Sequence, residues 1–138
     1  TYYEGWPESH KMLSELWRRE RFDVVIGFSQ GAAAAAMLCA EIEPKPKFGI
    51  FVSGFVPKDR EAAACLLAGD SNFPTLHIIG QADEVVVPER SRALGELFPD
   101  PTIIEHVGGH MLPSGAVVRK EVRAFLESFA EENIAMPQ

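Results

Sequence analysis

Four short apolar runs, separated by segments with helical spacing, constrain the fold of this chain more than any other feature of its sequence. The runs are rich in β-branched and aromatic residues, and polar residues do not alternate cleanly with apolar ones along them. They occupy residues 22–28, 48–53, 75–79 and 102–106. Strands of this kind are buried on both faces of a parallel sheet, and right-handed crossovers through helices join them. We therefore predict an α/β fold in which helices cover both faces of a parallel sheet.

The segments between these runs carry apolar residues at helical spacing or are rich in alanine. They predict helices over 8–20, over 30–42, within 57–70, from Pro88 through Leu97 and Phe98, and over 115–132. In a parallel sheet of this type, ligands gather at the carboxyl ends of the strands. The residues that follow each apolar run are therefore the first candidates for a functional site.

Length and charge exclude several classes of protein. A chain of 138 residues is sufficient for one domain without disulfides. Its 13 basic and 20 acidic residues give a net charge of −7, and no basic cluster suggests binding to nucleic acid. No apolar run is long enough to span a membrane, and the first residues do not resemble a secretory signal. We expect a cytoplasmic protein, with an organellar location as the alternative.

The first apolar run ends in Gly27-Phe28-Ser29-Gln30-Gly31, and a helical segment follows at once. This G-x-S-x-G pattern at a strand-to-helix turn is typical of a nucleophilic serine, because the sharp turn lifts the hydroxyl above the sheet and brings the two glycine positions so close together that a side chain there would clash. The helix start directs the backbone N–H of Gln30 toward a developing oxyanion. The alternative is a glycine-bracketed turn in which Ser29 only caps the helix.

A serine hydroxyl needs a general base, and the sequence offers four histidines. His110 follows the fourth run in a loop with two glycines, Gly108 and Gly109, so we predict that it is the base. The alternative is a loop histidine without a partner. We expect His10 to lie on the solvated side of its helix, and His77 and His106 to be core histidines within strands.

The acid that orients the base should follow another strand. Asp83 comes shortly after the third run, in Gly80-Gln81-Ala82-Asp83, and we predict that it has this role. Its neighbour Glu84 is the rival candidate, which we expect to be solvated. The order Ser29, Asp83, His110 is the chain order of the triad in α/β-hydrolases.

Apolar residues close to these positions are candidates for an acyl pocket. We single out Phe28, Phe55 and Met111, each of which has plain core packing as its alternative. The segment 54–73 is too short to encode a large lid, which favours small or medium acyl groups. Cys39 and Cys65 stand at no metal-ligand spacing, so we expect reduced thiols and no metal site.

Several motifs in this order resemble the FSH-type serine hydrolase family of the α/β-hydrolase fold. They are FDVVIGFSQGAAAAA, FVSGFVP, PTLHIIGQADEVVVP and HVGGHMLP. The resemblance implies Ser29 as nucleophile, Asp83 as acid and His110 as base. It also implies a carboxylesterase or thioesterase that needs neither a metal nor an organic cofactor, and a small-molecule ester or thioester as substrate.

The chain departs from this family at its beginning. Family members open with a strand, a His-Gly loop that supplies a second oxyanion donor, and further strands. Residues 1–138 therefore resemble a partial α/β-hydrolase domain, the last three-fifths of it. The strand over 22–28 would have an unpaired edge, which is an aggregation hazard unless it is covered. The expected cover is the missing N-terminal part of the same chain or a complementing polypeptide.

Two classes of function follow. The first is acyl transfer to water by a serine hydrolase. The second is a catalytically weak or inactive subunit or interaction module, derived from a hydrolase, that needs another segment to complete its sheet. A recruited homologue with a structural role and a regulatory protein that binds a small acyl ligand are further alternatives.

Overall fold

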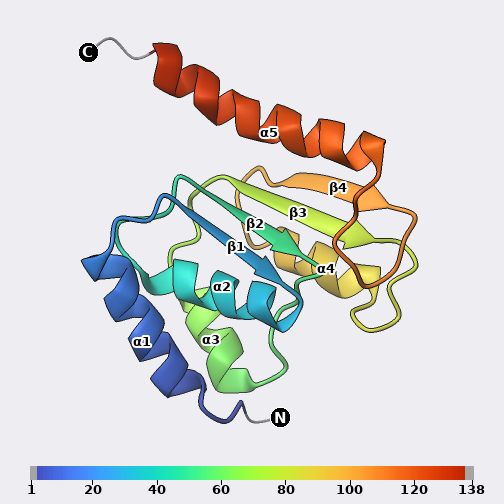
Figure 1. Cartoon of the computed structure of the whole chain (residues 1–138). Helices are drawn as coiled ribbons and strands as arrows, with labels where there is room; N and C mark the ends of the chain where they lie inside the picture. Colours follow the sequence, from blue (N-terminus) through green and yellow to red (C-terminus); the bar gives the residue numbers. More distant parts are fainter. Residues whose placement is uncertain (1–2, 136–138) are drawn as a thin grey trace.

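A four-stranded parallel sheet forms the centre of the computed structural model, which describes residues 3–135, with side chains up to residue 130 (Figure 1). The strands lie in chain order, β1-β2-β3-β4, and every neighbouring pair is parallel. Their bounds are β1 Val24–Phe28, β2 Phe48–Val52, β3 Thr75–Gly80 and β4 Thr102–His106. The predicted parallel α/β architecture is confirmed.

The described residues form five helices close to the predicted ranges, of which the first precedes β1, the next three connect successive strands and the last follows β4. They are α1 Trp6–Arg19, α2 Gln30–Glu41, α3 Arg60–Ala68, α4 Pro88–Gly95 and α5 Ala116–Ala135. The main difference is at α4, which ends before Leu97 and Phe98. Phe98 instead leaves the helix and packs in the core, with its ring 5.4 Å from that of Phe51. Within residues 3–135, no helix is long and apolar enough to cross a membrane.

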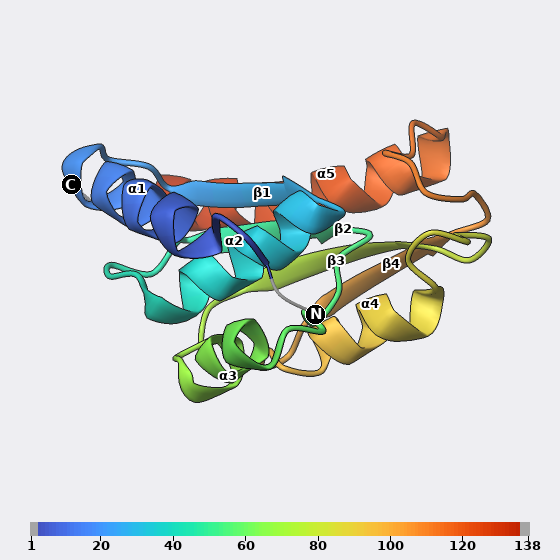
Figure 2. The same ribbon diagram turned by 90° about the horizontal axis from the view of Figure 1, so that it is seen from below.

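Two apolar cores form on opposite faces of the sheet, as expected for strands buried on both sides. Helices α2, α3 and α4 cover one face, where Phe51 packs with Leu66 and Leu94. Helix α5 covers the other face, where its Phe129 stacks on Phe48 of β2 at 4.5 Å between ring centroids. Figure 2 shows the sheet between these two layers.

Strand β1 lies at the edge of the sheet, as the sequence predicted, and pairs only with β2 among the described strands. On the face that carries α5, its side chains are poorly covered: Ile26 is 66% exposed and Phe28 is 38% exposed. The central strands β2 and β3 are buried along their whole length. An apolar strand with one free edge and one bare face is unusual in a parallel sheet.

Candidate active site

Ser29 occupies the sharp turn between β1 and α2, in a backbone conformation that residues with a side chain rarely adopt. Its φ is 57° and its ψ is −120°. The Ser29 N–H donates to the carbonyl of Val52, 2.8 Å away, which ties the turn to the neighbouring strand. Ser29 is the N-cap residue of α2, but its hydroxyl makes no capping hydrogen bond, so the alternative in which the side chain only caps the helix is wrong.

The two glycines of the motif differ in their structural role. A Cβ atom on Gly27 would lie 2.5 Å from the carbonyl oxygen of Gly31 and 2.6 Å from Cα of Ala32. A Cβ on Gly31 would meet only open space. The expectation that a side chain would clash at both glycine positions is therefore correct for Gly27 and wrong for Gly31. The reason is that α2 crosses over β1 at Gly27, whereas Gly31 faces outward on the first turn of the helix.

Asp83 and His110, which come from the loops after β3 and β4, are hydrogen-bonded. Their Oδ2 and Nδ1 atoms lie 2.9 Å apart. The other carboxylate oxygen of Asp83 accepts from the backbone N–H groups of Val85 and Val86, both at 2.9 Å. The rival candidate Glu84 is exposed, as expected. Both oxygens of the buried carboxylate thus have hydrogen-bond partners.

Backbone contacts hold these two loops together. The N–H of Ala82 donates to the carbonyl of Gly108 at 3.0 Å, and the N–H of Gln81 donates to the carbonyl of His106 at 2.8 Å. Gly80 makes this contact possible, because a Cβ there would lie 2.4 Å from the carbonyl oxygen of Gly109. The position of the imidazole relative to the carboxylate is therefore set by backbone contacts between the two loops.

The charge state of Asp83 follows from this environment. Burial of the carboxyl group opposes its ionisation, but hydrogen bonds from His110, Val86 and Val85 outweigh burial and lower the pKa of Asp83. An ionised Asp83 accepts a hydrogen bond from the Nδ1–H of His110. This leaves Nε2 of the neutral imidazole without a proton, which is the tautomer that a general base requires.

The imidazole of His110 also lies beside the end of β1. Its ring centroid is 5.0 Å from that of Phe28, the residue before Ser29. No hydrogen bond connects the Ser29 hydroxyl to His110 among the described side chains. In structures without substrate, such contacts are often long and tighten only when substrate binds.

A cavity of about 750 Å³ opens beside Ser29, between the start of α2, the amino-terminal half of α1 and the loops after β2 and β3. Phe55 lines this cavity, as predicted for the acyl pocket. Phe28 and Met111, the other two pocket candidates, are absent from its lining. Phe28 packs against the imidazole instead, and Met111 is 48% exposed on the loop of His110.

The remaining histidines have other surroundings. His77 is buried, its Nε2 lies 3.0 Å from Oγ1 of Thr75, and burial lowers its pKa to about 4. His106 is buried and its Nδ1 accepts from the N–H of Gly108. Both are core histidines, as predicted. His10 is half-buried with Nε2 only 2.7 Å from Oε2 of Glu41, so the expectation of a solvated His10 is wrong.

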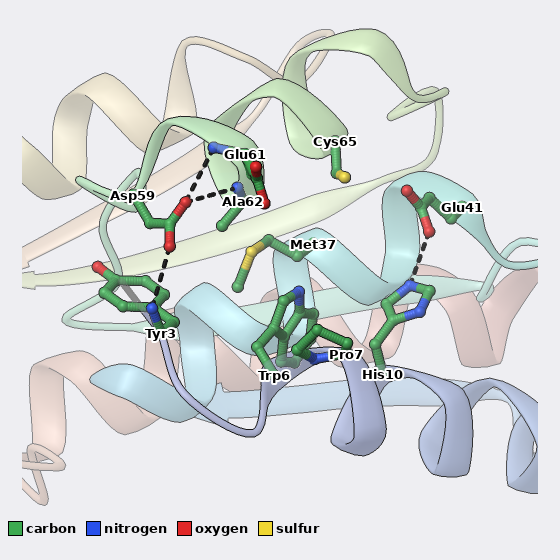
Figure 3. A pocket seen from close by; sticks show the side chains of 10 residues that line it. All are labelled: Tyr3, Trp6, Pro7, His10, Met37, Glu41, Asp59, Glu61, Ala62 and Cys65. Atoms are coloured by element: carbon green, nitrogen blue, oxygen red, sulfur yellow. Dashed lines mark hydrogen bonds and ion pairs between the residues drawn. The ribbon is translucent and has the colours of Figure 1, made fainter. Parts of the chain in front are cut away.

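A second cavity, of about 280 Å³, lies between α1, α2 and α3. Figure 3 shows the side chains that line it. This cavity shares Tyr3, Trp6 and Met37 with the cavity beside Ser29. Its thiol, Cys65, is a poor nucleophile, because desolvation and the nearby Glu41 raise the pKa of the thiol. The larger cavity is therefore the better candidate for a reaction site.

Two residues of interest were not recognised in the sequence. Ser53, at the end of β2, is buried, has a φ of 50°, and its hydroxyl has no hydrogen-bond partner among the described residues. Strained residues of this type cluster at functional sites. Arg90, in the first turn of α4, lines the cavity beside Ser29. The motif FVSGFVP contains Ser53, but no local pattern distinguishes Arg90 from the other arginines.

The model of the family described as "Serine hydrolase (FSH1)" matches residues 1–122 of this chain. The chain is 37% identical over 134 residues to human Esterase OVCA2, covering 92% of this chain and 59% of the human protein. It is 35% identical over 132 residues to Esterase AAEL000016 of Aedes aegypti, covering 92% of this chain and 46% of the mosquito protein. The chain thus spans about half of the length of these relatives.

Solved structures share the fold. Acyl-protein thioesterase 2 of Zea mays superimposes with a TM-score of 0.65 at 22% sequence identity. The match covers 91% of this chain and 64% of the maize protein. At this identity the similarity establishes the α/β-hydrolase fold alone.

Proposed function

Because this chain belongs to the FSH1 serine hydrolase family, we propose that it hydrolyses carboxylic esters or thioesters, with Ser29, Asp83 and His110 as the catalytic triad. The observation that carries the proposal is the hydrogen-bonded pair of Asp83 and His110 at the same edge of the sheet as the strained Ser29 turn. A buried acid that orients an imidazole is the arrangement that activates a serine hydroxyl.

The reaction follows from these positions. The Ser29 hydroxyl attacks the carbonyl carbon of the substrate while His110 Nε2 accepts its proton. The C–O or C–S bond then breaks, and the leaving alcohol or thiol takes this proton from the imidazolium. Water attacks the resulting acyl-Ser29 with His110 again as base, and the carboxylic acid departs. Asp83 holds the imidazole and stabilises its positive charge throughout.

The start of α2 supplies part of the oxyanion stabilisation. The N–H of Gln30 has no acceptor within the helix, because it belongs to the first turn. No acidic residue stands in that turn, so the positive end of the helix dipole is not neutralised there. A second donor is expected from a segment that precedes this part of the fold. Loss of one such donor typically costs a factor of about 10²–10³ in kcat.

The cavity beside Ser29 bears on the acyl group. A volume of about 750 Å³ lies within the usual range for small-molecule sites. Phe55, Val86 and Met37 supply apolar walls, which suit a hydrocarbon chain of small to medium length. We therefore propose that this cavity holds the acyl group of a single small or medium ester. A large lipid assembly would not fit it.

A fluorophosphonate probe tests the proposal. We expect one adduct on the intact protein by mass spectrometry, mapped to Ser29, and no adduct on the Ser29→Ala variant. The Ser128→Ala variant is the matched control, because Ser128 is exposed on α5, which covers the opposite face of the sheet. Full labelling of Ser29→Ala would refute the assignment of the nucleophile.

The bare edge of β1 supports the alternative function, a hydrolase-derived subunit or interaction module with little or no activity. We propose in either case that a preceding part of the same polypeptide or a complementing one pairs with this edge and covers Ile26. An Ile26→Lys substitution in the intact protein should then destabilise it by about 2–3 kcal/mol, since the charge would be buried.

The control for this experiment is Val117→Lys, at a position on α5 that is 71% exposed. If Ile26→Lys is as well tolerated as Val117→Lys, nothing covers the Ile26 side chain and the proposed cover is wrong. A folded protein that neither reacts with the probe nor cleaves esters would favour the alternative function over the hydrolase.

A further inference from the structure

Arg90 places a guanidinium group in the wall of the cavity that contains Ser29. The residue is half-buried, and its guanidinium carbon lies 4.5 Å from the ring centroid of Phe55, another wall residue. Its Nη2 donates a long hydrogen bond of 3.5 Å to the carbonyl of Val56. The contact with the Phe55 ring therefore helps to hold the guanidinium in place, and one hydrogen bond is the only use of its N–H donors among the described residues.

No carboxylate among the described side chains lies within 4 Å of this guanidinium. The contrast with Arg92, two residues further along α4, is clear. Arg92 lies 2.6 Å from Glu105 and 3.6 Å from Glu89, in an exposed cluster of charges. Arg90 is half-buried and has no such partner among the described side chains, which is a costly position for a cation.

The position of Arg90 within α4 is a second unfavourable factor for its positive charge. Arg90 is the third residue of the helix, in the first turn, where the helix dipole favours negative charge. Among the described residues, neither the helix dipole nor an ion pair thus compensates the charge of Arg90, since the acid of the same turn, Glu89, lies against Arg92. A bound anion would do so, and it would also interact favourably with the start of α4.

The surroundings of the cavity strengthen this preference for an anion. Helix α2 also begins at the cavity, and Figure 1 shows that α2 and α4 both start at the edge of the sheet where the strands end. Glu4 is the only carboxylate of the described lining, and it is exposed on the segment before α1. Solvent screens such a charge much more than it screens a half-buried guanidinium.

We propose that Arg90 makes this site selective for esters or thioesters that carry a second, anionic group, such as a carboxylate. The inference rests on the proposed hydrolase function and specifies its substrate class. The anionic group belongs to the acyl chain or to the leaving group, and its carboxylate would form a paired hydrogen bond with the planar guanidinium. Arg90 is a specificity residue here, because it contacts the substrate away from the reacting carbonyl.

Paired substrates test the proposal on the intact protein. One pair is the monoester of a six-carbon dicarboxylic acid and its neutral analogue with an amide in place of the free carboxylate. The other pair carries the same carboxylate or amide on the leaving alcohol. We expect kcat/KM to favour the anionic member of one pair by about tenfold to hundredfold, the range for a charge-assisted hydrogen bond. The responding pair identifies the side of the substrate that Arg90 contacts.

The Arg90→Gln variant should lose this preference, because its KM rises much more for the anionic ester than for the neutral ester. Arg92→Gln is the matched control, since it removes an arginine of the same helix that is exposed and paired with Glu105. The control should keep the preference. Equal kcat/KM values within both wild-type pairs, with the neutral esters still cleaved, would overturn the inference and leave the hydrolase function standing.

A binding measurement keeps the inference testable if no ester is cleaved. The Ser29→Ala variant should bind the anionic esters of the responding pair at least tenfold more tightly than the neutral ones in calorimetry. Addition of Arg90→Gln should abolish the difference. Equal affinities would overturn the role of Arg90, whereas loss of turnover and of probe labelling in the wild type would count against the hydrolase function itself.

Discussion

His110 Nδ1 lies 2.9 Å from Asp83 Oδ2, although 27 residues separate the two along the chain. The contact depends on backbone hydrogen bonds between the loops after β3 and β4, and on the absence of a side chain at Gly80. The carboxylate is buried and has two further N–H donors, so it is fixed on both oxygens. The geometry therefore imposes one orientation and one tautomer on the imidazole.

Removal of the charge at Asp83 should impair catalysis far more than folding. An Asp83→Asn variant keeps the shape of the side chain but favours the wrong imidazole tautomer, so we expect kcat to fall by about 10³–10⁴. Steady-state hydrolysis of a chromogenic ester measures this. Glu84→Gln, at the exposed neighbour, should retain wild-type activity. An Asp83→Asn variant with more than a tenth of the activity would contradict the role of Asp83.

The strained turn at Ser29 predicts that replacing this residue by glycine would stabilise the protein but abolish its reactivity. A φ of 57° with a ψ of −120° suits glycine and costs other residues about 1–3 kcal/mol. Ser29→Gly should therefore raise the free energy of unfolding by about 1 kcal/mol, after the entropy cost of glycine, while abolishing probe labelling. Urea denaturation measures the first effect. A destabilised Ser29→Gly protein would show that the turn is not strained.

Gly27 and Gly31 of the motif differ in the space available for a side chain, so the same substitution at both positions should have different effects on stability. Gly27→Ala would force a Cβ against the backbone of α2 and should destabilise the protein by about 1–3 kcal/mol. Gly31→Ala points into open space on a helix and should be neutral or stabilising by up to about 1 kcal/mol. Thermal denaturation of both variants tests the difference, and equal melting temperatures would disprove it.

The buried His77 predicts a loss of stability in mild acid. Burial lowers the pKa of His77 to about 4, below its ordinary value of 6.5, so between these values the unfolded chain binds more protons than the folded one. The stability contribution of the neutral ring is complete above pH 6.5 and is lost as the pH falls toward 4. At pH 5 the loss amounts to about 2 kcal/mol.

Denaturant titrations at pH 7.5 and pH 5 measure this loss, and His77→Phe is the informative variant. Phenylalanine does not titrate and fits among the rings of Phe51 and Phe98, which lie 5.3 Å from His77. The variant loses the contact with Thr75, so its absolute stability is lower. Its stability should nevertheless change less between the two pH values. An unchanged pH dependence would assign the effect to other groups.

Local sequence patterns predicted most of the architecture correctly. Strand β4 has the predicted bounds, 102–106, and α2 begins at the predicted Gln30. These elements depend on neighbouring residues: β-branched runs favour strands, and Pro44 prevents helix continuation before it. The end of α4 was missed, because Phe98 continues the apolar spacing of the helix but packs in the core of the sheet.

For the candidate site, too, local sequence patterns predicted some residues and not others. Ser29, Asp83 and His110 were predicted as the triad from their places after apolar runs, since parallel strands bring their carboxyl ends to one edge. The pocket was predicted less well. Phe55 lines the cavity, but Phe28 turns toward His110, because side chains at the end of an edge strand are placed by whatever packs beside them.

The sequence alone thus determined the order of the elements, the parallel sheet and the three residues of the candidate triad, because periodicity and turn chemistry act between neighbours along the chain. Only the tertiary structure decided that Asp83 contacts His110, that Gly27 and not Gly31 is sterically required, and that Arg90 faces the cavity of Ser29. These relationships join segments far apart in sequence. They arise from the crossing of α2 over β1 and from the docking of the loops after β3 and β4, which no local pattern encodes.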